Sequence, residues 1–371
     1  MSELAVTSHG FKEELEPGEP VLEVEDLTVD FGTDDGIVHA VRGVSYTVMP
    51  GEVLAIVGES GSGKSVSSMA IMGLLPRSAT IGGSARFRGV ELLGMNLKRL
   101  NRVRGKEIAM IFQDPMTSMN PVHRVGTQIS EALRVHHPDL SKGAAWARAV
   151  DMLDLVDIPN PKERARNYPH EFSGGMRQRA VIAMAMANDP DIIIADEPTT
   201  ALDVTVQAQV LETLIKVKDE INSSVILITH DLGVVAGLAN RVMVMYAGKP
   251  VEYGAVDEIY EHPRMPYTLG LLGSLPRLDA EGSERLTPIT GVPPSLINLP
   301  PGCPFQPRCP IARPMCNEVE PALTRTENSE HLAACHYSSE LSGDVAAEEI
   351  FEVTAVDDFD VEAVLGETGQ P

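Results

Sequence analysis

The chain has 371 residues, of which 43% are hydrophobic and 22% charged, and its formal net charge is −23. This length and composition allow a large buried core and more than one domain. The acidic balance argues against nucleic acid as a main partner, because the phosphate backbone binds Lys and Arg.

Both ends of the chain are expected to lie outside the folded core. Residues 1–20 form an acidic leader without the basic patch and apolar run of a secretory signal. Residues 338–371 contain ten acidic residues and no Lys, Arg or His, which is typical of a solvated, disordered tail. No apolar run between them approaches the roughly 18 residues that cross a bilayer, so we expect no membrane span.

Between these ends, strand patterns alternate with helical patterns. Continuous apolar runs predict strands that are covered on both faces, at Val53–Val57, Ile108–Phe112, Ile192–Ala195 and Val225–Ile228. Helical patterns lie between them, for example at Val66–Leu75 and Val206–Glu220. This alternation predicts an α/β fold with a mostly parallel sheet.

The same patterns suggest domain boundaries. Residues 21–275 are expected to form one main unit, because no internal repeat is present. Within this unit the strand signal fades over about residues 114–177, which we interpret as an inserted helical subdomain. Pro and Gly become frequent after Pro276, which predicts a separate small domain over residues 276–337.

The strongest local signal is the sequence GESGSGKS, which follows the first buried strand. Glycines let the backbone wrap around phosphates, while successive N–H groups and a helix N-terminus attract the anion. In this GxxxxGK[ST] pattern, Lys64 would reach the β- and γ-phosphates and the Ser65 hydroxyl would ligate Mg²⁺. The predicted nucleotide-binding residues of the loop are Gly58, Glu59, Ser60, Gly61, Ser62, Gly63, Lys64 and Ser65.

Two adjacent carboxylates end a later buried strand, in the sequence IIIADE. Ligands bind at the carboxyl ends of strands in sheets of this kind. Asp196 is therefore expected to hold Mg²⁺, and Glu197 to act as the base that polarises the attacking water.

A second candidate anion site lies at Phe172–Met176 (FSGGM), just before a helical pattern. One chain needs only one phosphate cradle, so the second predicts a dimer in which each chain covers its partner's nucleotide. The alternative is a helix cap with flexible glycines.

The order of these motifs resembles the ATP-binding subunits of ABC transporters over about residues 21–255, with Phe172 and Met176 as modest departures from the family signature. The resemblance implies a P-loop NTPase (RecA-like) core with an antiparallel β subdomain and an inserted α-helical subdomain, followed by a small Cys-rich domain.

The resemblance also implies roles for single residues. The implied catalytic residues are Glu197, His230 and Gln113, and the implied Mg²⁺ ligands are Ser65, Gln113 and Asp196. Gln113 would also link to the membrane subunits, and His230 would hold the γ-phosphate. The further implied nucleotide contacts are Phe31, which would stack on adenine, Ser173, Gly174 and Gly175, which would contact the partner's ATP, and Asp203, which would organise the dimer interface.

The region after residue 260 resembles the C-terminal extension of the ATPases of oligopeptide/dipeptide importers, in the sequences EHPRMPYT and LPPGCPFQPRCP. FSGGMRQR is similar to the D-type subunit, which pairs with a homologous F-type ATPase. The implied complex also contains two transmembrane permease subunits and an extracellular peptide-binding protein, and the chain would lie peripherally on the cytoplasmic face of the membrane. Nickel, glutathione or another small solute remains an alternative cargo. A soluble ABC-type ATPase acting on DNA or ribosomes, and a subunit that binds ATP without hydrolysing it, are the alternative functions.

Four cysteines follow the spacing C-x5-C-x6-C-x18-C, at Cys303, Cys309, Cys316 and Cys335. Structural zinc sites usually contain close CxxC pairs, and none is present. Single, separated cysteines favour a [4Fe-4S] cluster, in which each thiolate serves its own iron. Zinc, with His331 or His336 as a substitute ligand, and metal-free thiols are the alternatives.

Overall fold

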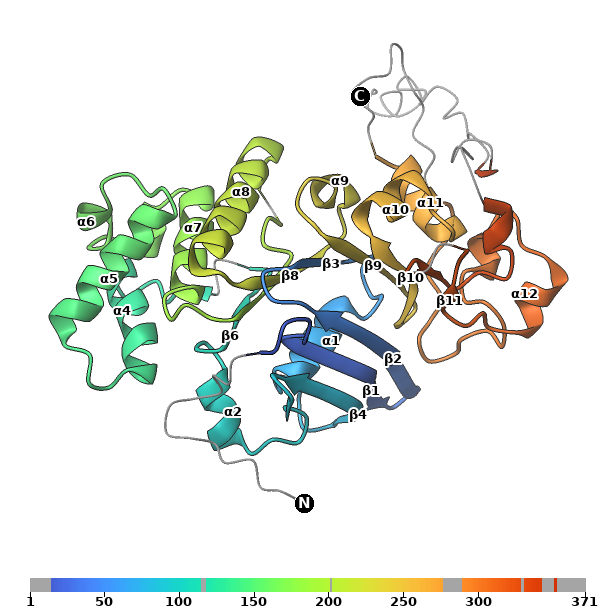
Figure 1. The fold of residues 1–371 in the computed structure, drawn as a ribbon, viewed down its shortest axis with the longest axis horizontal. Helices are drawn as coiled ribbons and strands as arrows, with labels where there is room; N and C mark the ends of the chain where they lie inside the picture. Colours follow the sequence, from blue (N-terminus) through green and yellow to red (C-terminus); the bar gives the residue numbers. More distant parts are fainter. Residues whose placement is uncertain are drawn as a thin grey trace, which may run out of the picture.

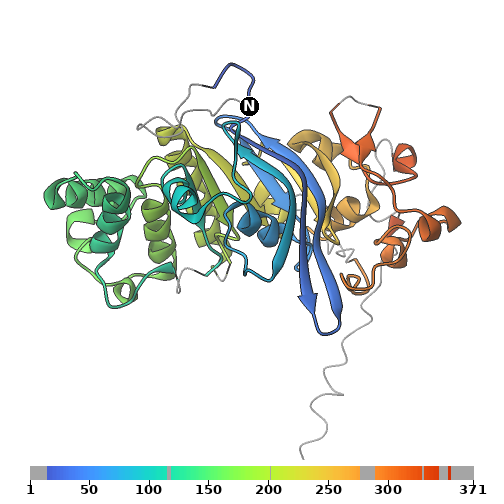
Figure 2. The same ribbon diagram turned by 90° about the horizontal axis from the view of Figure 1, so that it is seen from below.

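The computed structural model describes residues 15–114, 118–200, 202–275, 289–327, 330–341 and 350–351. The predicted leader and acidic tail fall largely outside these residues. Figures 1 and 2 show three parts in a row: a group of helices at one end, two sheets in the middle, and the cysteine-containing part of the chain at the other end.

A large mixed sheet runs through the middle of the molecule. Its strands are β3 (Val53–Val57), β6 (Ile108–Ile111), β7 (Ile192–Asp196), β8 (Ser224–Thr229), β9 (Arg241–Tyr246), β10 (Lys249–Ala255), β11 (Thr324–Arg325) and β12 (Leu332–Ala333). Their order is β11-β12-β10-β9-β3-β8-β7-β6. The strands from β9 to β6 pair in parallel, whereas β10, β11 and β12 pair antiparallel. The four predicted buried strands are confirmed.

A second, antiparallel sheet lies against one face of the first. Its strands are β1 (Leu22–Thr33), β2 (Gly36–Val48), β4 (Ala79–Phe87) and β5 (Val90–Glu91), in the order β2-β1-β4-β5. Alternate side chains of a strand point to opposite faces. Leu54 and Ile56 of β3 accordingly join the core beneath this sheet, together with Ala70 and Ile71.

Some helices pack on the sheets, and others lie at the two ends of the molecule (Figure 1). They are α1 (Lys64–Ile71), α2 (Leu97–Val103), α4 (Val125–His136), α5 (Lys142–Leu155), α6 (Pro161–Arg164), α7 (Gly174–Ala185), α8 (Val204–Ile221), α9 (Leu232–Val235), α10 (Val256–Glu261), α11 (Pro266–Gly273) and α12 (Pro314–Glu318). The two predicted helices that follow the phosphate loop and the acidic strand correspond to α1 and α8, each beginning two residues earlier than its pattern.

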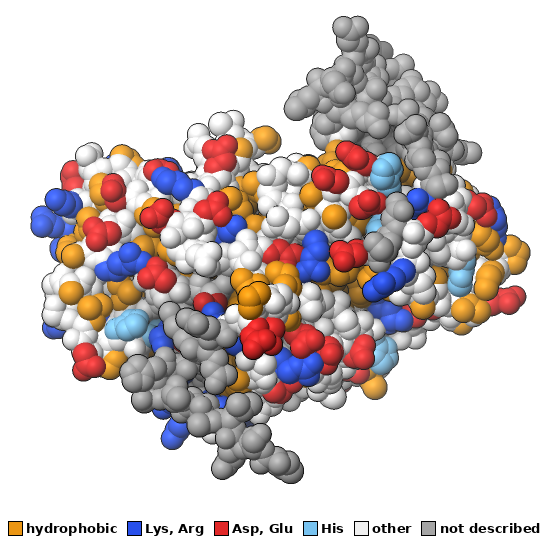
Figure 3. Space-filling view, viewed as in Figure 1, with side chains coloured by type: hydrophobic (Ala, Val, Ile, Leu, Met, Phe, Trp, Pro, Cys, Tyr) orange, Lys and Arg blue, Asp and Glu red, His pale blue; other side chains and the backbone are white. Residues whose placement is uncertain are grey.

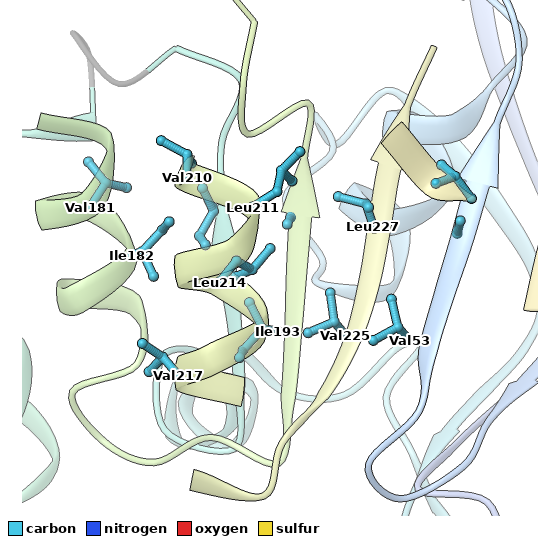
Figure 4. Close-up of a cluster of buried hydrophobic side chains, with 14 of the residues drawn as sticks. Val53, Val181, Ile182, Ile193, Val210, Leu211, Leu214, Val217, Val225 and Leu227 are labelled. Carbon is cyan, nitrogen blue, oxygen red and sulfur yellow. The ribbon is translucent and has the colours of Figure 1, made fainter. Parts of the chain in front are cut away.

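Figure 4 shows how α7 and α8 pack on the second face of the large sheet. Val181 and Ile182 of α7 face α8, and Leu214 of α8 lies over the sheet with Ile193 and Val225. Burial of a side chain of this size contributes about 1.5–3 kcal/mol. Helix α7 begins at the candidate site residue Gly174, and α8 begins directly after the candidate Asp203.

The Cys-rich segment, defined here as the described residues within 289–341, does not stand apart from the large sheet. Its strand β12 pairs with β10, with Leu332 opposite Tyr253. The Ala334 N–H also donates to the Val251 carbonyl at 2.8 Å. This segment therefore extends the sheet by the two short strands β11 and β12.

Among the described residues, no helix has the length and apolar character that a membrane crossing requires. On the face drawn in Figure 3, the Lys and Arg side chains are interspersed with Asp and Glu.

Candidate functional site

The phosphate loop connects β3 to α1 along a path that only glycine permits at two points. Gly58 and Gly63 have φ angles of 149° and 99°. A Cβ atom on Gly58 would lie 2.2 Å from the Met245 carbonyl oxygen, and one on Gly63 would lie 2.4 Å from that of Ala40. The loop is therefore pressed against backbone on both sides, which fixes its curvature.

Lys64, the first residue of α1, is buried in this loop. Its Nζ donates to the carbonyl oxygens of Gly58 at 2.6 Å and Glu59 at 3.0 Å. Burial lowers the pKa of Lys64, although the carboxylates of Glu197, Asp196 and Glu59 oppose that shift. The ammonium group thus occupies a pocket with a partly compensating negative charge.

Ser65 and Asp196 meet across the start of α1 and the end of β7. The Ser65 Oγ donates to Asp196 Oδ1 at 2.8 Å. Burial raises the pKa of Asp196 against the effect of this hydrogen bond, and the neighbouring Glu197 raises it further. A partly buried pair of hydroxyl and carboxylate oxygens is a donor set that suits Mg²⁺.

Glu197 directly follows β7, and its carboxylate contacts three polar side chains. Its Oε2 accepts from Gln113 Nε2 and from Thr200 Oγ1, both at 2.8 Å, and its Oε1 lies 3.4 Å from His230 Nδ1. Burial raises the pKa of Glu197, but the Thr200 hydrogen bond and the charges of His230 and Lys64 outweigh burial, so the pKa lies below its usual range. The carboxylate is therefore ionised at neutral pH.

Glu197 also has a strained backbone, with φ at 45°. A non-glycine residue in this region costs free energy and is concentrated at functional sites. The turn is held by the Glu197 N–H, which donates to the Ile228 carbonyl at 2.8 Å.

The parallel strands explain why these residues meet. Gln113 follows β6, Asp196 ends β7, His230 follows β8, and the phosphate loop follows β3. The carboxyl ends of parallel strands share one edge of the sheet, where such folds bind ligands. Six predicted site residues are thus brought together: Lys64, Ser65, Gln113, Asp196, Glu197 and His230.

The predicted signature residues lie at the start of α7 and pack against the start of α8. Ser173 caps α7, because its side chain accepts from the Met176 N–H at 3.3 Å. Asp203 caps α8 in the same way, accepting from the Val206 N–H at 3.0 Å. A Cβ on Gly175 would lie 2.5 Å from Val206 Cγ1, so the two helix starts touch. The two candidate dimer motifs are therefore neighbours within one chain.

Phe31 lies on β1, opposite Val38 of β2 and Ala79 of β4. Its ring is half-buried against the core of the antiparallel sheet. The implied contact with adenine stays a prediction.

Three side chains that the sequence patterns did not single out take part in the site. Thr200 hydrogen-bonds Glu197, as described above. Tyr267 of α11 accepts from the Glu59 N–H at 2.9 Å, and Arg308 of the Cys-rich segment binds the Glu59 carboxylate. Thr200 lies three residues after Glu197, a spacing that is typical of a turn and could have predicted their contact. No sequence pattern predicts the contacts of Tyr267 and Arg308 with Glu59.

The four cysteines line one small cavity, together with Phe305 and Pro321 among others. Burial, with a smaller contribution from the nearby thiols, raises the pKa of Cys309 to about 12 and that of Cys335 to about 11. Burial also raises the pKa of Cys303. Within the part of the chain that the structure describes, no three His, Cys, Asp or Glu side chains form a group that could hold a metal ion.

Both histidines considered as zinc ligands have other hydrogen-bond partners. His331 is 2% exposed, and its Nε2 lies 2.8 Å from Glu252 Oε1. The Nε2 of His336 lies 2.9 Å from the Val319 carbonyl oxygen. His331 does not line the cysteine cavity, whereas His336 is part of its lining.

Comparisons with known proteins agree with this geometry. A family model described as "ABC transporter" matches residues 41–200, and one described as "Oligopeptide/dipeptide transporter, C-terminal region" matches residues 251–316. The two matches cover the phosphate loop, the signature, the acidic strand and the first three cysteines.

Curated relatives are similar over most of this chain. The oligopeptide transport ATP-binding protein OppD of Salmonella typhimurium is 54% identical over 82% of this chain and 91% of its own length. The dipeptide transport ATP-binding protein DppD of Bacillus subtilis is 54% identical over 85% and 94%. OppD of Mycobacterium tuberculosis is 56% identical over 89% of this chain, which spans about half (54%) of that protein.

Among solved structures, a dimeric ATP-binding cassette in a post-hydrolysis state, bound to ADP and Pi, is similar with a TM-score of 0.57. It is 26% identical and covers 63% of this chain and 98% of its own.

Proposed function

This chain belongs to the ATP-binding subunits of ABC transporters, in the group of oligopeptide and dipeptide transport proteins, and from this membership we propose that it hydrolyses ATP to drive peptide import. The observation that carries the proposal is the meeting of Lys64, Ser65, Asp196 and Glu197 at one edge of the sheet. The phosphate loop, a hydroxyl–carboxylate pair and an ionised carboxylate lie there next to one another.

In the proposed reaction, Lys64 exchanges its bonds to the loop carbonyls for bonds to the β- and γ-phosphates of ATP. Ser65 and Asp196 would hold Mg²⁺, with Gln113 as a further ligand, and the ion would neutralise charge that develops on the phosphates. Glu197 accepts a proton from the attacking water, and His230 contacts the γ-phosphate. Positioning and electrostatic stabilisation then supply most of the rate enhancement.

The proposed role of Glu197 has a direct test. In the assembled transporter, Glu197→Gln should leave Mg-ATP binding intact and reduce turnover by about 10²-fold or more, because the amide cannot accept the proton. Glu212→Gln, an exposed residue of α8, is the matched control. Turnover by Glu197→Gln at the rate of the unaltered protein would exclude Glu197 as the base.

We propose that the working ATPase is a dimer with a homologous F-type subunit. Ser173, Gly174 and Gly175 of each chain would contact the nucleotide bound to the partner, and Asp203 would organise the interface. The contact between the starts of α7 and α8 supports this arrangement, because it holds the two motifs as one surface. Phe31 would stack on the adenine of the nucleotide bound in its own chain.

The proposed complex also contains two transmembrane permeases and an extracellular peptide-binding protein, with this chain on the cytoplasmic face of the membrane. The helical part at about residues 114–177 would contact the permeases, and Gln113, directly before it, would link the nucleotide site to them. The cargo is proposed from relatives named for oligopeptide and dipeptide transport. Uptake of labelled peptides, nickel and glutathione by reconstituted vesicles would separate the candidate cargoes.

We also propose that the Cys-rich segment is a small domain joined to the large sheet through β12, and that its cysteines bind a [4Fe-4S] cluster. The meeting of all four cysteines at one cavity supports a shared ligand. A cluster uses one thiolate for each iron, so it accepts thiols that are too far apart for a single ion. The raised thiol pKa values mean that binding must displace protons, so acid should favour release.

The cluster proposal is tested by the visible absorption spectrum of anaerobically purified protein, with iron and zinc assays. Four iron atoms per chain, reduced by Cys316→Ser, are expected. Bound zinc, or four reactive thiols without metal, would overturn the proposal.

A further inference from the structure

Glu59 is the second residue of the phosphate loop, and its carboxylate is bound by the Cys-rich segment. Arg308 donates from Nη1 to Glu59 Oε2 at 2.6 Å and from Nη2 to Glu59 Oε1 at 2.8 Å. The side chain of Arg308 is 4% exposed and that of Glu59 is 27% exposed. Two parallel bonds between a guanidinium and a carboxylate form a strong and directional pair.

Arg308 is itself fixed by further contacts. Its Nε donates to the Thr290 carbonyl at 3.0 Å, and Nη1 also lies 3.3 Å from the Tyr246 hydroxyl. The guanidinium lies 5.9 Å from the ring centres of both Tyr246 and Phe305. The hydrogen bond to Glu59 is the main reason that the pKa of Arg308 is raised, so the positive charge is permanent.

The same part of the chain lines the cysteine cavity. Arg308 directly precedes Cys309, and Phe305 lines the cavity with Cys303 and Cys309. The Phe305 ring also packs edge-on against Tyr246, with 5.4 Å between ring centres. A change in the conformation of this turn would therefore also move the side chain of Arg308.

The position of Glu59 matters because Lys64 is close. Lys64 donates to the Glu59 carbonyl, and the Glu59 carboxylate acts on the pKa of Lys64. A carboxylate released from Arg308 would compete with phosphate for Lys64 and for the loop N–H groups, which attract any anion. It would also repel the triphosphate.

We infer that Arg308 is a positioning residue that keeps the Glu59 carboxylate away from the phosphate-binding groups, so that the Cys-rich segment sets the affinity of this subunit for ATP. This inference rests on the proposed ATPase function. It gives the cysteine-containing turn a regulatory role at the nucleotide site.

The test measures the equilibrium binding of a fluorescent ATP analogue with Mg²⁺ to the full-length chain. Arg308→Gln should raise Kd about tenfold, which corresponds to the loss of one charged hydrogen-bonded contact. Adding Glu59→Gln to Arg308→Gln should restore most of the affinity, because the competing carboxylate is then absent. In the assembled transporter, Arg308→Gln should raise the KM for ATP far more than it lowers kcat.

Arg313→Gln is the matched control, because Arg313 lies in the same segment but pairs with Glu340 on the surface. It should leave Kd unchanged. If Arg308 served only the stability of the fold, the double variant would bind no better than Arg308→Gln, and that result would overturn the inference. Equal binding by Arg308→Gln and the unaltered chain would overturn it as well. Absence of binding by the unaltered chain would instead overturn the proposed function, and the inference with it.

Discussion

The Ser65 hydroxyl donates to Asp196 Oδ1 at 2.8 Å, joining two residues that lie 131 positions apart in the chain. Ser65 belongs to the first turn of α1, and Asp196 ends β7. Burial raises the pKa of Asp196 because it destabilises the ionised carboxylate. A further positive charge at this point would therefore stabilise the ionised form. The position of the pair beside the phosphate loop and the raised pKa of Asp196 therefore both support the proposed Mg²⁺ site.

Asp196→Asn should raise the Mg²⁺ concentration for half-maximal ATPase activity by about 10- to 100-fold, the range for loss of a residue that supports a bound metal. The measurement is a Mg²⁺ titration at fixed ATP in the assembled transporter. Asp191→Asn is the control, since Asp191 precedes the same strand at its other end and pairs with Arg88. An unchanged Mg²⁺ requirement in Asp196→Asn would remove Asp196 from the metal site.

Thr200→Val should move the acid limb of the pH–rate profile to higher pH. Glu197 has a lowered pKa, so the ionised base is present above that pKa and is lost as the pH falls through it. Valine cannot make the hydrogen bond by which Thr200 lowers the pKa of Glu197 against the effect of burial. The pKa of Glu197 should therefore rise, and activity should disappear at a higher pH. Thr200→Ser keeps the hydroxyl and should keep the limb in place. Superimposable profiles for valine and serine would show that Thr200 does not tune the base.

Sequence patterns were sufficient where structure depends on local signals. Val53–Val57 is buried along its whole length, and its apolar run predicted the same bounds. Lys64 and Ser65 were identified because the phosphate loop needs fixed spacing between glycines and a helix start. The meeting of these residues with Asp196 and Glu197 followed from the parallel order of the strands.

Contacts between distant parts of the chain carried no such signal. Arg308 and Glu59 are 249 positions apart, and no sequence pattern around either residue predicts contact with the other. The pairing of β12 with β10 was also missed, because a strand of two residues shows no periodicity. The Cys-rich segment was consequently predicted as separate, whereas it extends the main sheet.

Gly175→Ala should destabilise the protein by about 1–3 kcal/mol, the cost of inserting a methyl group into a packed contact. Its Cβ would lie 2.5 Å from Val206 Cγ1, and a β-branched side chain has little freedom to move aside. Chemical denaturation measures the loss. Adding Val206→Ala should recover part of it, because that change removes the opposing methyl groups. If the two losses simply add, the starts of α7 and α8 do not press on each other at this point.

His331→Leu should loosen the Cys-rich segment from the large sheet. His331 is buried between Glu252, at 2.8 Å from Nε2, and Glu258, at 3.7 Å from Nδ1. Glu252 is fully buried and its Oε2 has no hydrogen-bond partner, so loss of the imidazole leaves a poorly compensated carboxylate in the interior. Breaking such a buried pair costs about 3–5 kcal/mol.

The measurement for His331→Leu is unfolding by denaturant together with limited proteolysis between residues 289 and 341. Replacing both members, in Glu252→Leu/His331→Leu, should cost less than the single change, because no unpaired charge then remains in the core. Both variants retain Tyr253, which lies opposite Leu332 in the same strand pair. If the double variant were less stable than His331→Leu, Glu252 would stabilise the fold through a partner other than His331, such as the Arg264 N–H that donates to Glu252 Oε1.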